Sequence, residues 1–320
     1  MKKKISAIAT ILIPILLGAG LTFYYLSTFS EQQIDQMKGY FRNANYNYVL
    51  ISLFWAVIGY VLRAYRWKYT LNHIGFQSDF KLNFLAVSIG YFVNLSIPRS
   101  GEISRALILK KYQNIPFDKG FGTIIAERIV DFIILLAIII GSVIIEFSKL
   151  KDFLLLYIPI TKLIVLLLIG FLLFLLFLYL YNYSKWKFIL MLKSKIEGIK
   201  DGALSVYNLP NKTPFLVYTL LIWLSYVLMF YYSTLTLNAT NSITFGTILV
   251  AFVIGSLTIA FTNGGFGFFP VLIAQILFLY GIPKEAGNAF GWIVWTSQLI
   301  ITVVLGGFSF LILPILYRKK

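Results

Sequence analysis

The stretch LSIPRSGEISRALILKK, residues 95–111, places charged side chains beside a proline and a glycine, directly after an apolar segment. Arg99, Glu102 and Arg105 follow Pro98 within seven positions. Because the residue before a proline is disfavoured in a helix, the chain is expected to break there. The stretch therefore predicts two helices joined at a break, with charges gathered around it.

The composition of the whole chain shows what surrounds this break. Hydrophobic residues make up 59% of the 320 positions and charged residues 12%, with a mean hydropathy of +0.83. Soluble domains carry roughly one quarter charged residues. No Asp, Glu, Lys or Arg occurs between Lys212 and Lys284, or between Glu285 and Arg318, so both stretches can enter hydrocarbon. The sequence predicts an all-α, polytopic integral membrane protein, forming a single domain over residues 1–320. A water-soluble helical solenoid would need charged faces there.

The formal net charge of +16 does not indicate nucleic-acid binding, because the basic residues lie between apolar spans rather than on a water-facing module. A position beside anionic lipid headgroups is expected instead. The chain has no cysteine, which excludes disulfides and thiol catalysis. Its one histidine, His73, lies in a polar loop. We expect no cofactor and no metal.

Apolar segments of the roughly 20 residues needed to cross a bilayer occur six times. They cover about 5–26, 47–67, 120–146, 160–182, 213–235 and 286–316. The first lacks a clear signal-peptidase site and is expected to be a retained helix. Two further segments are interrupted: 82–97 ends in Ser-Ile-Pro, and 245–281 contains TNGGFGFFP at 262–270. Backbone groups freed by such breaks must be satisfied by protein or trapped water, so both segments predict broken or re-entrant hairpins.

Loop charge indicates how these hairpins enter the membrane, because cytoplasmic loops carry an excess of Lys and Arg. If 82–112 enters from the cytoplasm and 245–281 from outside, the basic segments all lie inside: the N-terminus, 63–81, 99–119, 185–212 and the C-terminal Arg-Lys-Lys. The near-neutral segments, 27–46, 146–152 and 282–285, then lie outside. Both termini of this cell-membrane protein then lie in the cytoplasm. Opposed hairpins are the pattern of inverted-repeat transporters. An amphipathic helix at about 185–207 is expected in the cytoplasmic interface.

Two clusters of ionisable residues lie in these apolar surroundings, and they comprise Arg99, Glu102 and Arg105, then Glu127, Arg128 and Asp131. Such residues are costly in a membrane and are functional candidates. Glu127 and Asp131 are four positions apart and share a helical face. The spacing of three allows Arg128 to pair with Asp131, and Glu102 with Arg105.

The residue types favour a phosphate ligand. Arginine keeps its charge, and its planar fork matches phosphate oxygens. Ser100 and Gly101 stand at a helix start, where free N–H groups and the positive dipole end favour an anion. The carboxylates would orient the arginines. Alternatively, the basic residues anchor a cytoplasmic helix to anionic lipid, and the second cluster is an internal salt bridge.

The second break is rich in glycine and nearly free of charge. Gly264, Gly265 and Gly267 allow unusual backbone conformations and close approach, and Asn263 can donate or accept a hydrogen bond. We expect these residues to complete the binding site opposite the arginines. Simple helix packing through small residues is the alternative.

Three motifs in this order resemble the lysylphosphatidylglycerol synthase transmembrane-region family of flippase-like proteins. They are IPRSGEISRALILKK at 97–111, IIAERIVDFIILL at 124–136 and NGGFGFF at 263–269. The resemblance implies a lipid-handling domain, in a family linked to translocation of aminoacylated phospholipids or isoprenoid-phosphate-linked sugars. Relatives often carry an acidic residue after the glycines and an arginine in the last helix. Here Phe268 and GWIVWTSQLI at 291–300 stand instead, so this hairpin has less charge.

We expect a lipid transporter that moves an anionic phospholipid or isoprenoid-phosphate-linked lipid between leaflets, and not an enzyme. Arg99, Arg105 and Arg128 would hold the phosphate. Membrane lipids would surround the protein, and the sequence is compatible with a homo-oligomer. One alternative is a membrane transferase acting on a lipid phosphate, with Glu127 and Asp131 as candidate metal ligands. Another is a non-transporting partner of a separate enzyme.

Overall fold

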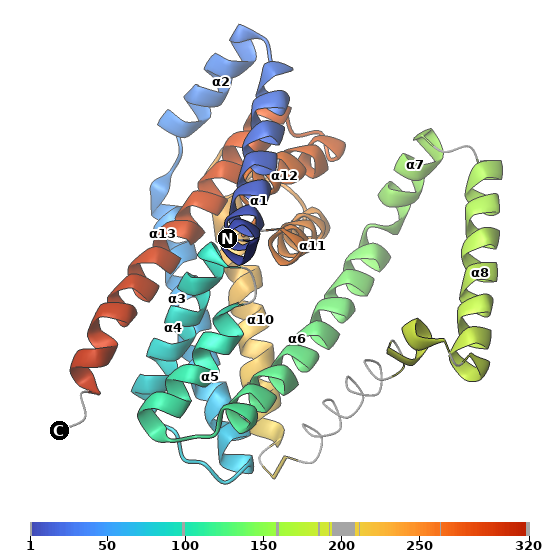
Figure 1. The fold of residues 1–320 in the computed structure, drawn as a ribbon. Helices are drawn as coiled ribbons and strands as arrows, with labels where there is room; N and C mark the ends of the chain where they lie inside the picture. Colours follow the sequence, from blue (N-terminus) through green and yellow to red (C-terminus); the bar gives the residue numbers. More distant parts are fainter. Residues whose placement is uncertain are drawn as a thin grey trace.

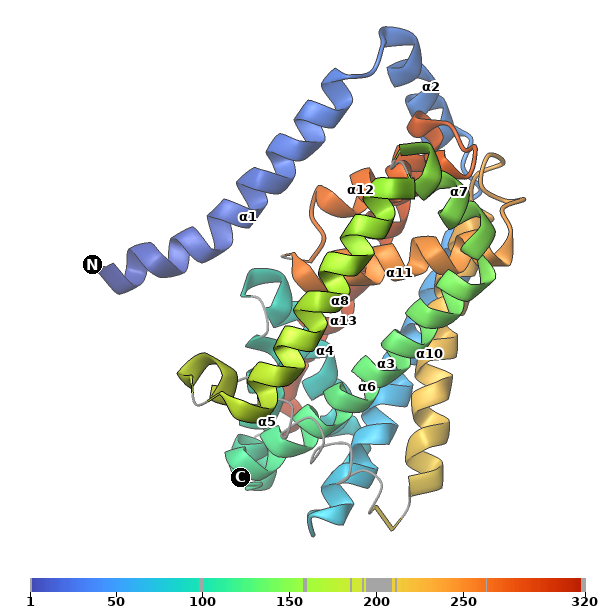
Figure 2. The same ribbon diagram turned by 90° about the vertical axis from the view of Figure 1, so that its right-hand side faces the viewer.

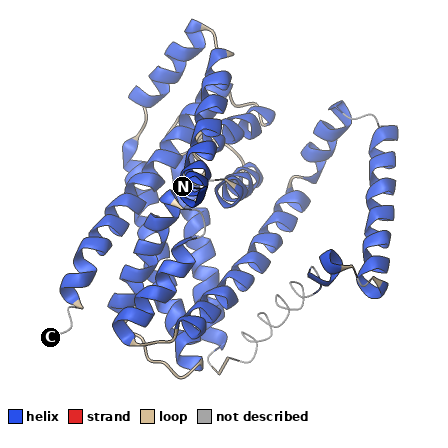
Figure 3. Cartoon of the chain, viewed as in Figure 1, coloured by secondary structure: helices blue, strands red, loops and turns tan. Residues whose placement is uncertain are grey.

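The chain folds entirely into helices in the part that the structure describes. The computed structural model describes residues 2–97, 100–157, 160–184, 186–191, 193, 209–210, 212–262 and 264–317. All regular structure in these residues is helical, which confirms the predicted all-α polytopic membrane protein (Figure 3). By length and hydropathy, four of the described helices can cross a membrane, and a bent pair at the amino terminus is a fifth candidate.

The first half of the bundle consists of a long helix, a helical hairpin and a second long helix. These elements are α3 (Tyr46–His73), α4 (Phe80–Ser96), α5 (Ser100–Gln113) and α6 (Phe117–Ile145). Helices α4 and α5 pack against each other on either side of the predicted break. The sequence LSIPRSGEI therefore divides two helices, as expected from its proline.

The second half repeats this order of elements. It comprises α10 (Lys212–Thr234), α11 (Phe245–Phe261), α12 (Phe268–Leu279) and α13 (Lys284–Leu316). The long helices α3 and α10 pack along each other, α4 packs on α13, and α11 packs on α6 (Figure 1). The first helix of each hairpin thus packs on the last helix of the other half.

The ends of the two hairpins are attached in corresponding ways. Asp79 caps the amino terminus of α4, and its carboxylate accepts a hydrogen bond from Tyr317, at the end of α13. Glu146, at the end of α6, accepts a hydrogen bond from Thr244, the cap of α11, at 3.4 Å. The last helix of each half therefore fixes the outer end of the other hairpin.

The connections separate into two ends of the molecule. In Figures 1 and 2 the α3–α4 and α5–α6 connections lie at one end, with the start of α10 and the end of α13. The α1–α2, α10–α11 and α12–α13 connections lie at the other end. The two hairpins therefore enter the bundle from opposite ends, and their breaks point toward its middle.

Two short helices occupy segments that the sequence suggested were loops. Helix α1 (Lys2–Ser27) turns by 116° into α2 (Glu31–Arg42), although 27–46 looked like a near-neutral loop. Ser30 accepts the N–H of Gln33, and its own N–H donates to the Gln33 side chain. This reciprocal cap was the available sequence signal. Helix α7 (Phe147–Tyr157) likewise follows α6 directly.

Helix α8 (Ile160–Tyr183) covers the predicted span at 160–182 and stands apart from the bundle with α7 (Figure 1). The predicted interfacial helix at about 185–207 lies mostly outside the described residues. Of that segment, residues 187–191 are helical.

Candidate functional site

Helix α3 contributes two buried arginines that the sequence interpretation did not include. Arg63 and Arg66 were counted as part of a basic cytoplasmic segment, yet they are 4% and 0% exposed. They lie three positions apart, so both face the interior of the bundle. A signal existed in the sequence, because Glu127 and Asp131 needed buried cationic partners and Arg63 and Arg66 begin a face that continues to Trp67 and Thr70.

Asp131 on α6 binds both of these arginines. Its Oδ2 accepts from Arg63 Nη1 at 2.9 Å and from Arg66 Nη2 at 3.1 Å, and its Oδ1 accepts from Arg66 Nη1 at 2.6 Å. Arg66 Nη1 also donates to Thr219 on α10 at 3.1 Å. A carboxylate held by two guanidinium groups can stay ionised away from water. Asp131 thus joins α6 to α3, and Arg66 extends the contact to α10.

Glu127, one turn before Asp131, lies beside the arginine of the first hairpin. Its Oε2 accepts from Arg105 Nη2 at 3.1 Å and lies 3.8 Å from Arg66 Nη2. The Arg105 guanidinium lies 4.0 Å from the centroid of the Trp67 ring, a cation–π contact. Arg105 and Glu127 are both buried, so the pair fixes α5 against α6 and α3.

The remaining charged pair is the more exposed part of this cluster. Arg128 Nε lies 3.3 Å from Glu102 Oε1, and the two side chains are 35% and 19% exposed. Arg128 Nη1 also lies 3.8 Å from Asp131 Oδ2, which confirms the predicted spacing-of-three pair. Glu102 and Arg105 do not pair with each other. Each reaches across to α6 instead, because the close packing of α5 on α6 brings opposite charges nearer between helices than along one.

We name the four arginines and three carboxylates the arginine cluster: Arg63, Arg66, Arg105, Arg128, Glu102, Glu127 and Asp131. Four cations against three anions leave one net positive charge among these residues. Several of their buried polar atoms make no hydrogen bond within the described residues. These atoms are Arg66 Nε, Arg105 Nε, Arg128 Nε, Glu102 Oε2 and Glu127 Oε1.

A small cavity lies against the arginine cluster at the first hairpin. It has a volume of about 10 Å³, close to what one water occupies. Its lining includes Arg63, Arg105, Arg128 and Glu102, together with Tyr91 and Asn94 of α4. The structure therefore shows this cavity in a closed form, with no room for a group larger than a water molecule.

Close backbone contact forms the wall of this cavity. Gly90 of α4 and Gly101 of α5 meet so tightly that a Cβ on Gly101 would overlap the Gly90 carbonyl oxygen. Asn94 Oδ1 accepts the N–H of Gly101 at 2.7 Å. The Ser100 hydroxyl donates to the Ile97 carbonyl at 2.5 Å. The predicted anion donor at Gly101 is thus occupied by Asn94 in this form, while Pro98 and Arg99 lie outside the described residues.

The second hairpin reaches the same region through its glycines. Gly264, Gly265 and Gly267 have φ of 66°, 80° and 72°, values that side chains rarely adopt. A Cβ on Gly264 would lie 3.9 Å from Leu95 Cδ2, next to the Asn94 that lines the cavity. Gly267 packs directly on the backbone of Gly18 in α1. Asn263 lies outside the described residues.

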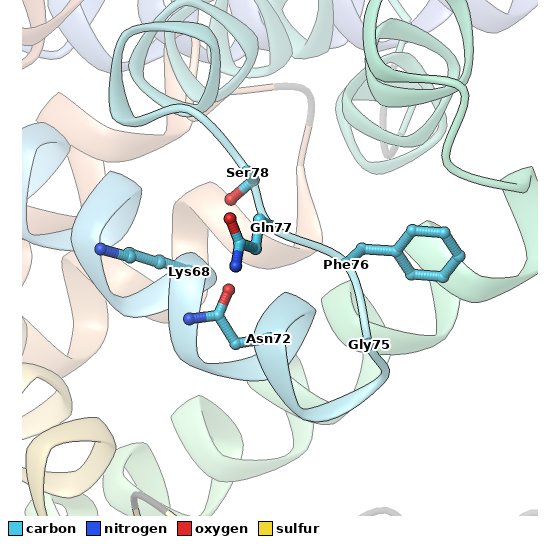
Figure 4. A pocket seen from close by; sticks show the side chains of 6 residues that line it. All are labelled: Lys68, Asn72, Gly75, Phe76, Gln77 and Ser78. Carbon is cyan, nitrogen blue, oxygen red and sulfur yellow. The ribbon is translucent and has the colours of Figure 1, made fainter.

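A larger cavity of about 580 Å³ lies elsewhere, on the α3–α4 connection. In Figure 4 the side chains of Asn72, Gln77 and Ser78 gather on one side of this loop, whereas Phe76 points away. Lys68 is the one charged side chain in its lining. Because one charged side chain lines this hollow, whereas seven charged side chains meet in the arginine cluster, we assign the site to the arginine cluster.

Comparison with known proteins identifies relatives over much of the chain. The family model for the lysylphosphatidylglycerol synthase TM region matches residues 11–306. The UPF0104 membrane protein MJ1595 of Methanocaldococcus jannaschii is 30% identical over 129 residues, which cover 38% of each chain. Glycosyltransferase AglD of Haloferax volcanii is 34% identical over 80 residues, 24% of this chain and 12% of that protein. No solved structure matches.

Proposed function

Because this chain belongs to the lysylphosphatidylglycerol synthase TM region family, we propose that it transports a phosphate-bearing lipid between membrane leaflets. The arginine cluster binds the phosphate, and the acyl or isoprenoid chains stay in the surrounding lipid. The protein acts as a transporter in the cell membrane rather than as an enzyme. The chain spans less than half the length of the curated relatives that it matches.

The observation that carries this proposal is the incomplete pairing of a buried, positively charged cluster. Burying a charged group without full hydrogen bonding costs several kcal/mol of folding free energy. Arg105 Nε and Arg128 Nε make no hydrogen bond within the described residues, and both side chains border the cavity. A phosphate oxygen would satisfy such donors and neutralise the net positive charge.

The Arg128–Glu102 pair is the element that opens the site. Its two side chains are the most exposed of the cluster, and their 3.3 Å contact lacks good hydrogen-bond geometry. The inner arginines, Arg63 and Arg66, are held by Asp131 on both sides of its carboxylate. We expect the phosphate to displace Glu102 from Arg128, while Asp131 keeps the inner arginines in place.

The arrangement of the hairpins supports a path to both leaflets. One hairpin enters from each end of the bundle, and Leu95 and Gly264 bring their breaks together. Six spans and two re-entrant hairpins in an inverted repeat would place the cluster where it can open to either side. The basic segments around the α3–α4 and α5–α6 connections lie at one end of the molecule, and we assign that end and both termini to the cytoplasm.

Transport by proteoliposomes tests this function. The purified protein is reconstituted with fluorescent phosphatidylglycerol, and lipid in the outer leaflet is quenched chemically to follow its exchange. Arg128→Gln should slow exchange at least about tenfold, since the phosphate loses a charge-assisted partner. Arg42→Gln, on the exposed α2, is the matched control and should exchange normally.

Arg128→Lys separates charge from shape, because lysine keeps the charge but lacks the planar fork. We expect partial exchange in this variant. Normal exchange in Arg128→Gln, with the protein monodisperse and folded, would contradict the assignment of the phosphate site. A wild-type protein that moves neither phosphatidylglycerol nor an isoprenoid phosphate lipid would contradict the proposed function.

A further inference from the structure

A series of neutral side chains leads away from the arginine cluster toward α13. Arg63 Nε donates to the Tyr226 hydroxyl at 2.5 Å, and that hydroxyl lies 3.3 Å from the hydroxyl of Tyr91. The Tyr91 and Tyr60 rings lie 4.8 Å apart. The Tyr60 hydroxyl is 3.1 Å from Thr302 Oγ1. This chain of contacts therefore runs through α10 and α4 back to α3, and it reaches the last helix at Thr302.

From Thr302 the same face of α13 continues to the second hairpin. Trp295, Gln298 and Thr302 are spaced by three and four positions, which places them on one side of the helix. Trp295 Nε1 donates to the Gly264 carbonyl at 2.8 Å. We name the five residues Trp295, Gln298, Thr302, Tyr60 and Tyr91 the α13 seam. It joins the wall of the arginine cavity, at Tyr91, to the glycine break.

The α13 seam has an unused hydrogen-bond donor. Gln298 Nε2 is buried and has no partner within the described residues. Beside it, the half-buried Trp295 packs with Trp292 and Phe266 at centroid distances of 5.6 and 5.5 Å. A ligand hydroxyl can accept from the free amide while its carbon atoms rest on the indole, because aromatic rings offer apolar area beside polar groups.

The α13 seam holds no carboxylate. Between Glu285 and Arg318 the sequence has no Asp, Glu, Lys or Arg, and the same is true from Lys212 to Lys284. The charged group joined to the seam through Tyr226 is Arg63, a cation. An ammonium headgroup placed at Gln298 would find no carboxylate on α13 after Glu285 in its first turn, so the chemistry at this residue favours an uncharged headgroup.

We propose that the α13 seam binds an uncharged, hydroxyl-bearing headgroup next to the phosphate, and that it disfavours a cationic aminoacyl headgroup. This inference rests on the proposed function, since it places the headgroup beside a phosphate held by the arginine cluster. Glycerol and a sugar share the required chemistry, because each presents several hydroxyls on a compact carbon frame.

The test compares lipids that differ only in the headgroup, bound to the purified full-length protein and counted by native mass spectrometry. Phosphatidylmethanol carries one negative charge and no hydroxyl, and phosphatidylglycerol adds two hydroxyls at the same charge. We expect phosphatidylglycerol to bind about tenfold more tightly, the effect of satisfying a buried donor. Lysyl-phosphatidylglycerol should bind more weakly than phosphatidylglycerol.

Substitutions assign the preference to the α13 seam. Gln298→Ala should remove most of the preference for phosphatidylglycerol while leaving phosphatidylmethanol binding unchanged, which also shows that the variant is folded. Gln298→Glu should shift the preference toward lysyl-phosphatidylglycerol by supplying the missing counter-charge. A glucosyl phosphoprenol forms the second arm, and the lipid that loses more affinity in Gln298→Ala identifies glycerol or sugar as the natural source of hydroxyls.

The outcomes separate this inference from the proposed function. Equal binding of phosphatidylmethanol and phosphatidylglycerol by the wild type would contradict the headgroup site at the α13 seam and leave the proposed phosphate site unaffected. The same conclusion would follow if Gln298→Ala kept the wild-type ratio of the two affinities. Tight binding of lysyl-phosphatidylglycerol by the wild type would overturn it as well. If none of these lipids binds, phosphatidylmethanol included, the result contradicts the proposed phosphate site and, with it, the headgroup site at the α13 seam.

Discussion

The two helical hairpins are built from helices of similar length but differ in charge. The α4–α5 hairpin carries Glu102 and Arg105 and packs on the charged face of α6, whereas the α11–α12 hairpin carries no charged side chain. Both are short helix pairs that enter from opposite ends and whose breaks meet at Leu95 and Gly264. Helix length and close packing at glycines are therefore common to both hairpins. Charged side chains occur in the first hairpin and not in the second.

This difference indicates how the work is divided in the proposed transporter. The first hairpin supplies charge for the phosphate, and the second supplies the Gly264 carbonyl and the Phe266 ring, which contact Trp295 of the α13 seam. Membrane burial makes the charged half sensitive to any unpaired group, because lipid cannot replace a lost partner. The neutral half should tolerate change better. Four substitutions compare the two halves, in order of decreasing expected effect.

The largest effect is expected from Asp131→Asn. The change leaves Arg63 and Arg66 buried without their shared carboxylate, and breaking a buried ion pair costs about 3–5 kcal/mol. The measurement is the free energy of unfolding in mixed micelles, followed by tryptophan fluorescence. The matched control is Asp35→Asn, an exposed acid paired with Lys38 on α2, which should unfold like the wild type. Equal stability of the two variants would show that the cluster is solvated.

A smaller loss is expected from Gly101→Ala in the first hairpin. The added Cβ would overlap the Gly90 carbonyl and press on Asn94, and overpacking of this kind costs about 1–3 kcal/mol. Gly122→Ala is the control, because that helical glycine on α6 has open space around its Cβ position and should be neutral or slightly stabilising. Thermal unfolding in detergent distinguishes them, and similar melting temperatures would argue against the tight α4–α5 contact.

Gly264→Ala in the second hairpin should cost about 1–2 kcal/mol. The space is adequate, with Leu95 Cδ2 at 3.9 Å, so the penalty comes from a φ of 66° that alanine adopts poorly. The same unfolding measurement applies. A loss larger than that of Gly101→Ala would reverse the expected order of the two hairpins.

The smallest effect on stability is expected from Glu102→Gln, because this side chain is partly exposed. Removing its charge frees Arg128, so binding of phosphatidylglycerol should become about two- to fivefold tighter, the range of an exposed ion pair. Titration by native mass spectrometry measures this change. Weaker binding would mean that Glu102 contacts the ligand rather than competing with it.

The sequence predicted the helical architecture well, because the relevant signals are local. Pro98 and the glycines at 264–267 marked the two breaks, and hydropathy marked α3, α6, α10 and α13. Helix α2 was missed because its mean composition is polar, although its Ser30–Gln33 cap gave a usable signal. Local sequence patterns were enough to predict most of the helices, but they did not show which helices would contact one another.

The candidate site was predicted only in part for the same reason. Glu127, Arg128 and Asp131 were recognised as one cluster, and the structure brings Glu102 and Arg105 to it. Their pairing runs between helices, which spacing along one helix cannot reveal. Arg63 and Arg66 were assigned to a cytoplasmic segment, since hydropathy does not show that the end of a long helix is buried by its neighbours.

The central claim is that the arginine cluster binds a phosphate-bearing lipid, and one measurement tests it most directly. Wild-type protein, Arg128→Gln and the control Arg42→Gln are purified in parallel and titrated with phosphatidylglycerol under native mass spectrometry. We predict saturable binding of one lipid by the wild type and Arg42→Gln, and an affinity at least about tenfold lower in Arg128→Gln. Equal affinity in all three proteins would contradict the account.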